Sequence, residues 1–150
     1  MAQKTWGNEV LTASDVQTYL TGEGGAWTAH TPTLSQGAST NIGKTVTYSN
    51  YARYGRTIIW NFRLAITGSG TSGSAVTVTL PVTSAATDSV TGAGAYLDTG
   101  TGWYFGTIIG ASTTTAVLIA ASGGSFGADP VMTVANTDTY QGSITYEAAS

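Results

Sequence analysis

The sequence predicts an all-β protein, an antiparallel β-sandwich or jelly roll with a short N-terminal helical arm. Three observations predict this fold. Charged residues make up only 9% of the 150 residues, against about 25% in an ordinary domain. Thr, Ser and 20 glycines take their place, and these residues suit strands joined by tight turns. Short alternating segments with turn sequences between them follow one another from Trp27 onward, which favours a sandwich or jelly roll.

The clearest strand is expected from Arg56 to Ile66. Alternate positions of this segment are apolar, and this period of two predicts a long central strand with one fully apolar face. The opposite face carries Ile59, Asn61 and Arg63. The charge of Arg63 indicates that this second face meets either water or a neighbouring subunit. The apolar positions are Ile58, Trp60, Phe62, Leu64 and Ile66.

Other strands are expected at shorter alternating segments, and Pro81 ends one of them because proline cannot donate to a strand ladder. A chain of this length can bury roughly 70% of the surface that its unfolded form exposes. We therefore expect one β-sandwich domain over residues 27–150. Its further strands are expected at Trp27–Thr31, Thr45–Tyr54, Val76–Leu80, Gly94–Leu97, Trp103–Ile109, Thr114–Ala120, Val131–Val134 and Thr139–Glu147.

Residues 1–26 have a different pattern and are expected to form an N-terminal attachment arm. Ser14 is a suitable N-cap for a short helix, Gln17 completes a capping box, and Gly22 follows the last helical residues. A helix of about two turns is marginal alone, so it is expected to dock either on its own domain or on a partner. In the second case the attachment residues are Trp6, Val10, Leu11, Val16, Tyr19 and Leu20.

Composition excludes several classes of function. The chain has no cysteine, and therefore no disulfide or thiolate metal site. The net charge is −3 with only five Lys and Arg residues, so nucleic acid is not an expected partner. No segment approaches the roughly 18 apolar residues of a membrane span. The first residues lack a signal peptide, so we expect the protein to stay in the producing cell until it is assembled or released.

The sequence motifs with chemical potential favour structural interpretations. His30 is the sole histidine and has no neighbouring partner for a triad or metal site. Asp98-Thr99-Gly100 matches the short signature of aspartic proteases, but that chemistry needs two carboxylates, and a hairpin turn is expected instead. Residues 68–73 fit G-x-G-x-x-G, yet a strand follows rather than a helix, so a loop is expected. The acidic residues are scattered without calcium-loop spacing. We expect no enzymatic activity, no catalytic residues, no cofactor and no metal.

Aromatic residues offer two alternatives. Trp103, Tyr104 and Phe105 put large rings on both faces of one strand. Exposed rings of this kind stack on sugars in carbohydrate-binding modules. The favoured alternative is core on one face and subunit interface on the other, because aromatic side chains dominate both.

Several stretches, spread along nearly the whole chain from Thr5 to Glu147, resemble small structural proteins of tailed bacteriophages. The resemblance implies a β-sandwich or jelly roll, usually trimeric, displayed on the virion. Such modules occur as head decoration proteins and at the ends of tail fibres or in minor tail proteins. The stretches are Thr5-Trp6, Val10–Leu20, Trp27-Thr28, Thr31–Leu34, Asn41–Gly43, Tyr51–Trp60, Leu80-Pro81 and Gly142–Glu147.

The two virion roles differ in the attachment that they require. A fibre tip needs a shaft, and the chain has no heptads or G-X-Y repeat before its β domain. A short arm fits direct attachment to a shell, so we expect a homotrimeric capsid decoration (cement) protein that is assembled into the virion in the host cytoplasm. Its partners would be copies of itself, through Ile59, Asn61 and Arg63, and the major capsid protein or other virion proteins. The alternative is a minor tail or tail-fibre protein that recognises a host glycan.

Overall fold

A computed structural model describes residues 26–150 as an all-β structure with one short 3-10 helix. Residues 1–25 of the predicted arm, which include all its attachment residues, lie outside the described part. In chain order the elements are β1 (Thr28–Ala29), β2 (Leu34–Gln36), β3 (Lys44–Tyr54), β4 (Thr57–Ile66), β5 (Val76–Thr79), η1 (Thr87–Ser89), β6 (Thr91–Asp98), β7 (Gly102–Gly110), β8 (Thr115–Ala120) and β9 (Thr139–Glu147).

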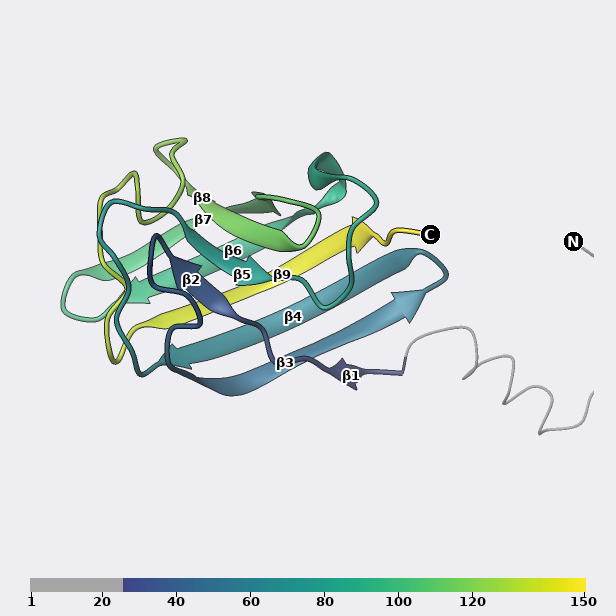
Figure 1. The fold of residues 1–150 in the computed structure, drawn as a ribbon, viewed down its shortest axis with the longest axis horizontal. Helices are drawn as coiled ribbons and strands as arrows, with labels where there is room; N and C mark the ends of the chain where they lie inside the picture. Colours follow the sequence, from purple (N-terminus) through teal and green to yellow (C-terminus); the bar gives the residue numbers. More distant parts are fainter. Residues whose placement is uncertain (1–25) are drawn as a thin grey trace, which may run out of the picture.

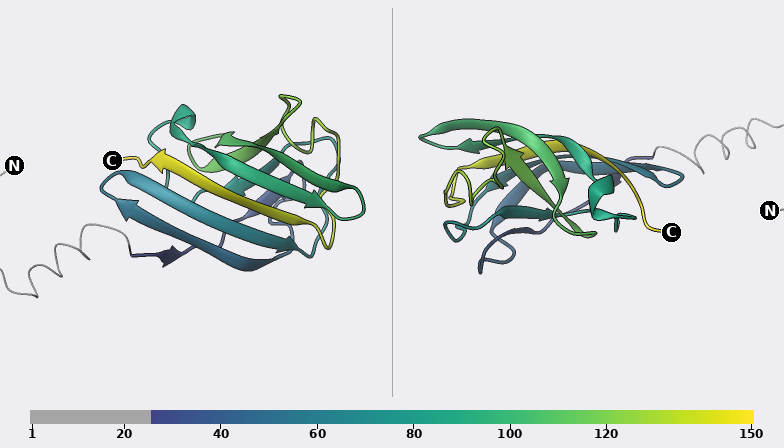
Figure 2. Two further views of the ribbon diagram at one scale, coloured as in Figure 1. Left: turned by 180° about the vertical axis from the view of Figure 1, so that it is seen from behind. Right: turned by 90° about the horizontal axis from the view of Figure 1, so that it is seen from above.

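The nine strands form one antiparallel sheet in the order β1-β3-β4-β9-β6-β7-β8-β5-β2. The predicted all-β class and antiparallel pairing are thereby confirmed. The sheet curls, so that β5 and β2 lie over the strands at its centre (Figures 1 and 2). The described chain begins and ends at the same end of the sheet as the turn between β3 and β4 (Figure 1).

The hydrophobic core lies inside this curl. The alternation predicted for the central strand is confirmed, because the five apolar positions of β4 are buried and the positions between them are half-buried or exposed. Trp60 stacks on Phe62 with ring centroids 4.5 Å apart, and Phe62 meets the edge of Tyr140 at 5.1 Å. The indole N–H of Trp60 donates to Ser49 at 3.0 Å, which pairs this buried donor.

A short segment between β1 and β2 joins the two edges of the curled sheet. Thr33 N–H donates to the hydroxyl of Thr79, and Thr79 N–H donates to the carbonyl of Thr33. The Nε2 atom of His30 lies 3.1 Å from the carbonyl oxygen of Thr79, and its ring meets Trp60 edge-on at 5.4 Å. His30 is therefore a structural residue, as the sequence predicted.

One predicted strand, Val131–Val134, is absent, and one observed strand, β2, was not predicted. Val131–Val134 is not a strand, because its backbone groups bond to the side chain of Gln36: Met132 O accepts from Nε2 at 2.8 Å and Val134 N–H donates to Oε1 at 2.9 Å. The short strand β2, which was not predicted, places Gln36 there. An amide side chain thus replaces a strand neighbour.

Candidate binding groove on the outer face of the sheet

The face of the sheet that points away from the core is called the outer face here. Two rows of its side chains run across the central strands β3, β4, β9, β6 and β7, in register from one strand to the next. Figure 2 shows these strands side by side from behind. The first row is Tyr48, Arg63, Gln141, Ala95 and Phe105, and the second is Asn50, Asn61, Ser143, Ala93 and Thr107.

Large rings stand at the two ends of the first row. Tyr48 at one end is 45% exposed, and Phe105 at the other end is 66% exposed. Trp103 lies beside Phe105 along β7, with ring centroids 6.1 Å apart and ring planes inclined by 21°. The two β7 rings form a nearly continuous aromatic wall that faces solvent. Because few large rings remain exposed in a folded domain without a reason, this wall indicates a contact surface.

An irregularity in β3 puts Tyr48 on the outer face. Val46 pairs with Leu64 on the inner side, and Tyr48 pairs with Arg63, so the register shifts by one residue between them. A bulge of this kind moves the following side chains to the opposite face of a sheet. Regular alternation from Val46 would have turned Tyr48 toward the core.

The sheet surface is recessed in the middle of both rows because the residues there have small side chains. Three glycines, Gly106, Gly94 and Gly142, are in register across β7, β6 and β9. On the inner side of Gly94 and Gly142, Ile108 occupies the space that a side chain would need, since its Cδ1 atom lies 2.6 Å from a Cβ built on Gly94. A Cβ on Gly106 would instead meet the backbone carbonyl of Ile119. Ala95 and Ala93 cover the outer side. Because glycine has no side chain, the three glycines in register add no bulk to the inner side of the sheet, and such positions often mark a bend in the strands.

Small residues between large rings leave a groove of about 360 Å³ on the outer face. Its polar lining consists of the amides of Asn61 and Gln141 and the hydroxyls of Ser143 and Tyr48. Amides both donate and accept hydrogen bonds. No lining residue carries a charge. The full lining is Tyr48, Asn61, Ala93, Gly94, Ala95, Phe105, Gln141, Gly142 and Ser143.

The predicted interface residues all lie on this face. Ile59 and Asn61 are half-buried and Arg63 is exposed. Asn61 lines the groove, while Arg63 stands in the first row between Tyr48 and Gln141. Their use in a subunit contact stays a prediction. The groove itself was not predicted, although Trp103 and Phe105 were recognised as exposed rings that could stack on sugars.

The sequence motifs fall at separate places in the fold. Asp98-Thr99-Gly100 forms the predicted hairpin turn between β6 and β7, closed by a 3.0 Å hydrogen bond from Thr101 N–H to Asp98 O. Residues 68–73 form the predicted loop between β4 and β5. His30 lies at the junction of the sheet edges, where burial lowers its pKa from 6.5 and the Thr79 carbonyl opposes the shift. The structure does not gather these groups into one site.

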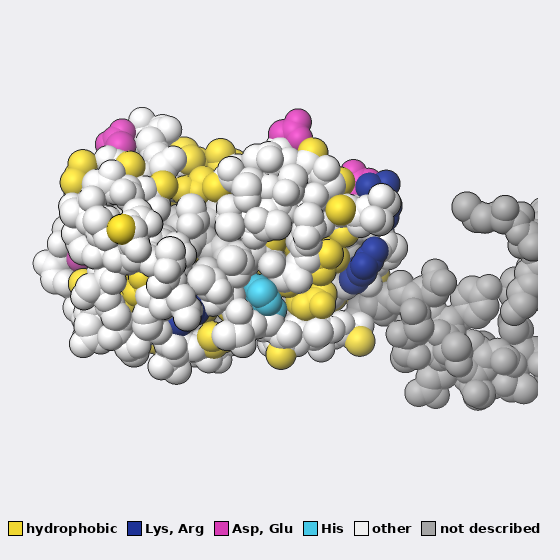
Figure 3. All heavy atoms as spheres, viewed as in Figure 1, with side chains coloured by type: hydrophobic (Ala, Val, Ile, Leu, Met, Phe, Trp, Pro, Cys, Tyr) yellow, Lys and Arg dark blue, Asp and Glu magenta, His cyan; other side chains and the backbone are white. Residues whose placement is uncertain are grey.

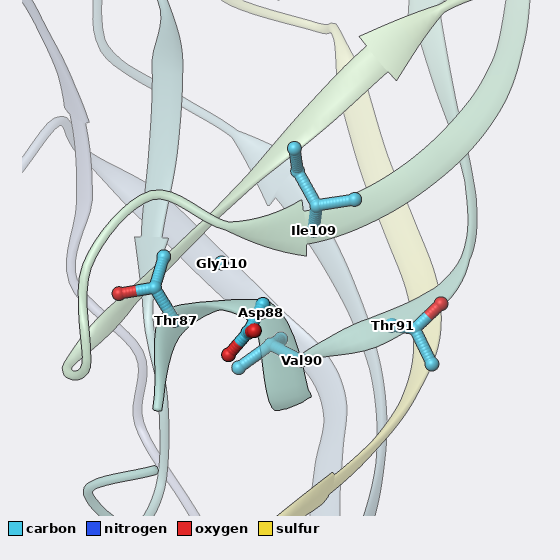
Figure 4. Close-up of a pocket in the computed structure, with 6 residues that line it drawn as sticks. All are labelled: Thr87, Asp88, Val90, Thr91, Ile109 and Gly110. Atoms are coloured by element: carbon cyan, nitrogen blue, oxygen red, sulfur yellow. The ribbon is translucent and has the colours of Figure 1, made fainter. Parts of the chain in front are cut away.

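A second hollow, of about 670 Å³, lies where η1 meets the start of β6 and the end of β7. Figure 4 shows that Asp88 is the one titratable side chain among its lining residues. Proton transfer between two groups, or a metal ion, would need more polar partners than one carboxylate. The other lining residues are Thr87, Val90, Thr91, Ile109 and Gly110.

Among residues 26–150, no three His, Asp or Glu residues lie close enough to hold a metal ion. The same part of the chain contains no helix long and apolar enough to cross a bilayer. Few charged side chains appear on the face that carries β2 and β5 (Figure 3). No protein-family model matches this chain, and no curated protein or solved structure is significantly similar to it. The functional assignment therefore depends on its own residues.

Proposed function

We propose that the protein is a non-enzymatic structural protein of a bacteriophage virion, displayed as a homotrimer on the particle surface. The sequence resemblance to phage structural proteins supports this proposal. In it, residues 1–26 are an attachment arm, and residues 27–150 are a β-sandwich of the jelly-roll type whose second layer includes β5 and β2. The described chain begins at the end of the sheet that also carries the C-terminus (Figure 1), and in this proposal the opposite end points away from the particle.

The observation that carries the proposal is the outer face itself. The hydrogen-bonded sheet there presents Tyr48, Trp103 and Phe105 to solvent, and Arg63 is the one charged residue of its two central rows. Exposed aromatic groups on a rigid support are typical of surfaces that contact other molecules. Two placements on the virion use this face differently.

In the first placement the protein is a capsid decoration protein that stabilises the shell. A neighbouring copy covers Ile59, Asn61 and Arg63, and the arm grips the major capsid protein through Trp6 and the apolar residues of its helix. Repeated attachment around a trimer multiplies a modest contact. Deleting residues 1–26 should then abolish binding to capsids while the trimer persists. Capsid binding that survives this deletion would remove the arm from the proposal.

In the second placement the protein belongs to the tail or its fibres and recognises the host surface. The groove favours this placement, because a copy packed over Asn61 would cover it. Here the outer face stays open in the assembled particle. An antibody against the outer face should block adsorption to host cells in this placement and leave it unchanged in the first.

Cryo-electron microscopy of virions of the phage whose genome encodes this chain tests the proposal as a whole. Copies around the three-fold positions of the capsid establish the first placement. A few copies at the tail tip establish the second. A purified virion that lacks the chain altogether contradicts the proposal in both forms.

A further inference from the structure

The groove on the outer face has the shape for an elongated ligand. It reaches from Tyr48 on β3 to Phe105 on β7, across the intervening strands β4, β9 and β6. Neighbouring strands lie about 4.8 Å apart, so these four steps span roughly 19 Å. An extended chain of several units fits this length better than one small compact molecule does.

The chemistry of the lining selects the class of ligand. The rings of Tyr48 and Phe105 offer apolar faces, and the Trp103 ring extends the second of these. Between them Asn61 and Gln141 offer amide groups that donate and accept. A sugar ring has the matching surfaces, since its C–H face is apolar and its hydroxyl groups both donate and accept. No lining residue carries a charge, which favours a neutral ligand. Arg63, exposed beside the lining in the first row, is the one cation nearby, so an acidic polysaccharide is included among the probes.

We propose that the groove binds a neutral saccharide chain that lies across the strands. One sugar unit packs on Phe105 and another on Tyr48, while Asn61 and Gln141 hydrogen-bond the hydroxyl groups between them. This inference rests on the second placement of the proposed function, in which the outer face stays open. It assigns the subunit contact of the trimer to residues outside the groove.

The test is a titration of the full-length protein with neutral oligosaccharides of glucose, galactose and N-acetylglucosamine, in short and long forms, and with an acidic polysaccharide. Binding is followed by NMR shifts of the groove amides and by the part of the tryptophan fluorescence that a Trp103→Phe variant loses. A longer oligomer should bind more tightly than a short one of the same sugar, because only the longer one reaches both rings. Affinity should change less than about twofold on adding salt, since no ion pair is involved.

Three variants locate the site. Phe105→Ala should weaken binding about tenfold, because the stacking surface is lost. Phe105→Tyr keeps the ring and should bind like the parent protein. Val131→Ala removes an exposed apolar side chain outside the groove and is the matched control. Sedimentation of every variant reports whether its oligomeric state has changed.

The outcomes separate this inference from the proposed function. Neutral-sugar binding that Phe105→Ala weakens without any change of oligomer supports it. The inference is overturned if none of the neutral probes binds, if only an acidic polysaccharide binds, or if Phe105→Ala binds normally. It is also overturned if Phe105→Ala dissociates the trimer, because the face is then a subunit contact. The place of the chain in the virion is measured independently.

Discussion

The hydroxyl of Tyr96 donates a 2.8 Å hydrogen bond to Oδ2 of Asp138, and both side chains are buried. The same carboxylate accepts from Thr99 N–H at 2.9 Å and from Ala135 N–H at 2.8 Å. Asp138 thereby ties the β6–β7 turn to the loop before β9. A buried carboxylate with three donors fixes the backbone of both segments.

Replacing Asp138 with Ala should lower the free energy of unfolding by about 2–4 kcal/mol. The change leaves the Tyr96 hydroxyl and two backbone N–H groups without their acceptor in a buried place. Tyr96→Phe removes one donor only and should cost about 1–2 kcal/mol. Urea unfolding measures both values. A loss under about 0.5 kcal/mol for Asp138→Ala would show that water replaces the carboxylate.

Gln36 offers a second test of buried polar pairing. Its amide donates to Ser74 O at 3.0 Å and Met132 O at 2.8 Å, and it accepts from Val134 N–H at 2.9 Å. Gln36→Ala should destabilise the fold by about 2–3 kcal/mol and speed hydrogen exchange at Val134. Gln141→Ala, which truncates a half-buried glutamine in the groove, is the matched control and should change stability little. Equal effects of the two changes would contradict this role of Gln36.

The glycine row should be intolerant of side chains. A Cβ on Gly94 would lie 2.6 Å from Cδ1 of Ile108, so Gly94→Ala should cost about 1–3 kcal/mol through overpacking. Adding Ile108→Val removes that Cδ1 atom and should recover part of the loss. Thermal unfolding of both variants checks this. If the double variant is no more stable than the sum of the single changes predicts, the clash is not the cause.

His30 should make stability depend on pH. Burial lowers its pKa below 6.5 in the folded protein, so the folded state binds fewer protons than the unfolded state. Stability should therefore fall as the pH drops below about 6.5 and through the lowered folded value. His30→Gln removes this titration. Urea unfolding of both proteins across this range should show a steeper decline for the parent, and parallel curves would contradict the assignment.

Local patterns in the sequence predicted the features that depend on neighbouring residues. The alternation of β4 was sufficient to place Trp60 and Phe62 in the core, because strand geometry dictates it. The hairpin turn at Asp98 was likewise predicted from neighbouring residues alone. The strand count predicted a β-sandwich, and this finer prediction is not confirmed: the nine strands form one curled sheet, whose order depends on pairings between distant strands.

The groove depends on register, which one sequence does not display. Tyr48 reaches the outer face only through the bulge after Val46, and its row is completed by residues from four other strands. The Val131–Val134 prediction failed for a related reason, since the partner is a side chain on β2. The exposed rings of β7 were the one local signal of the groove.

The edges of the sheet have a consequence for aggregation. The terminal strands β1 and β2 contain two and three residues, too few to template a long added strand. His30 links the two sides, because its backbone N–H donates to Ser49 O on β3 and its ring Nε2 lies 3.1 Å from Thr79 O on β5. A chain rich in Thr and poor in charge would otherwise be prone to fibrillar aggregation. Short edge strands therefore give a neighbouring chain little exposed ladder on which to pair.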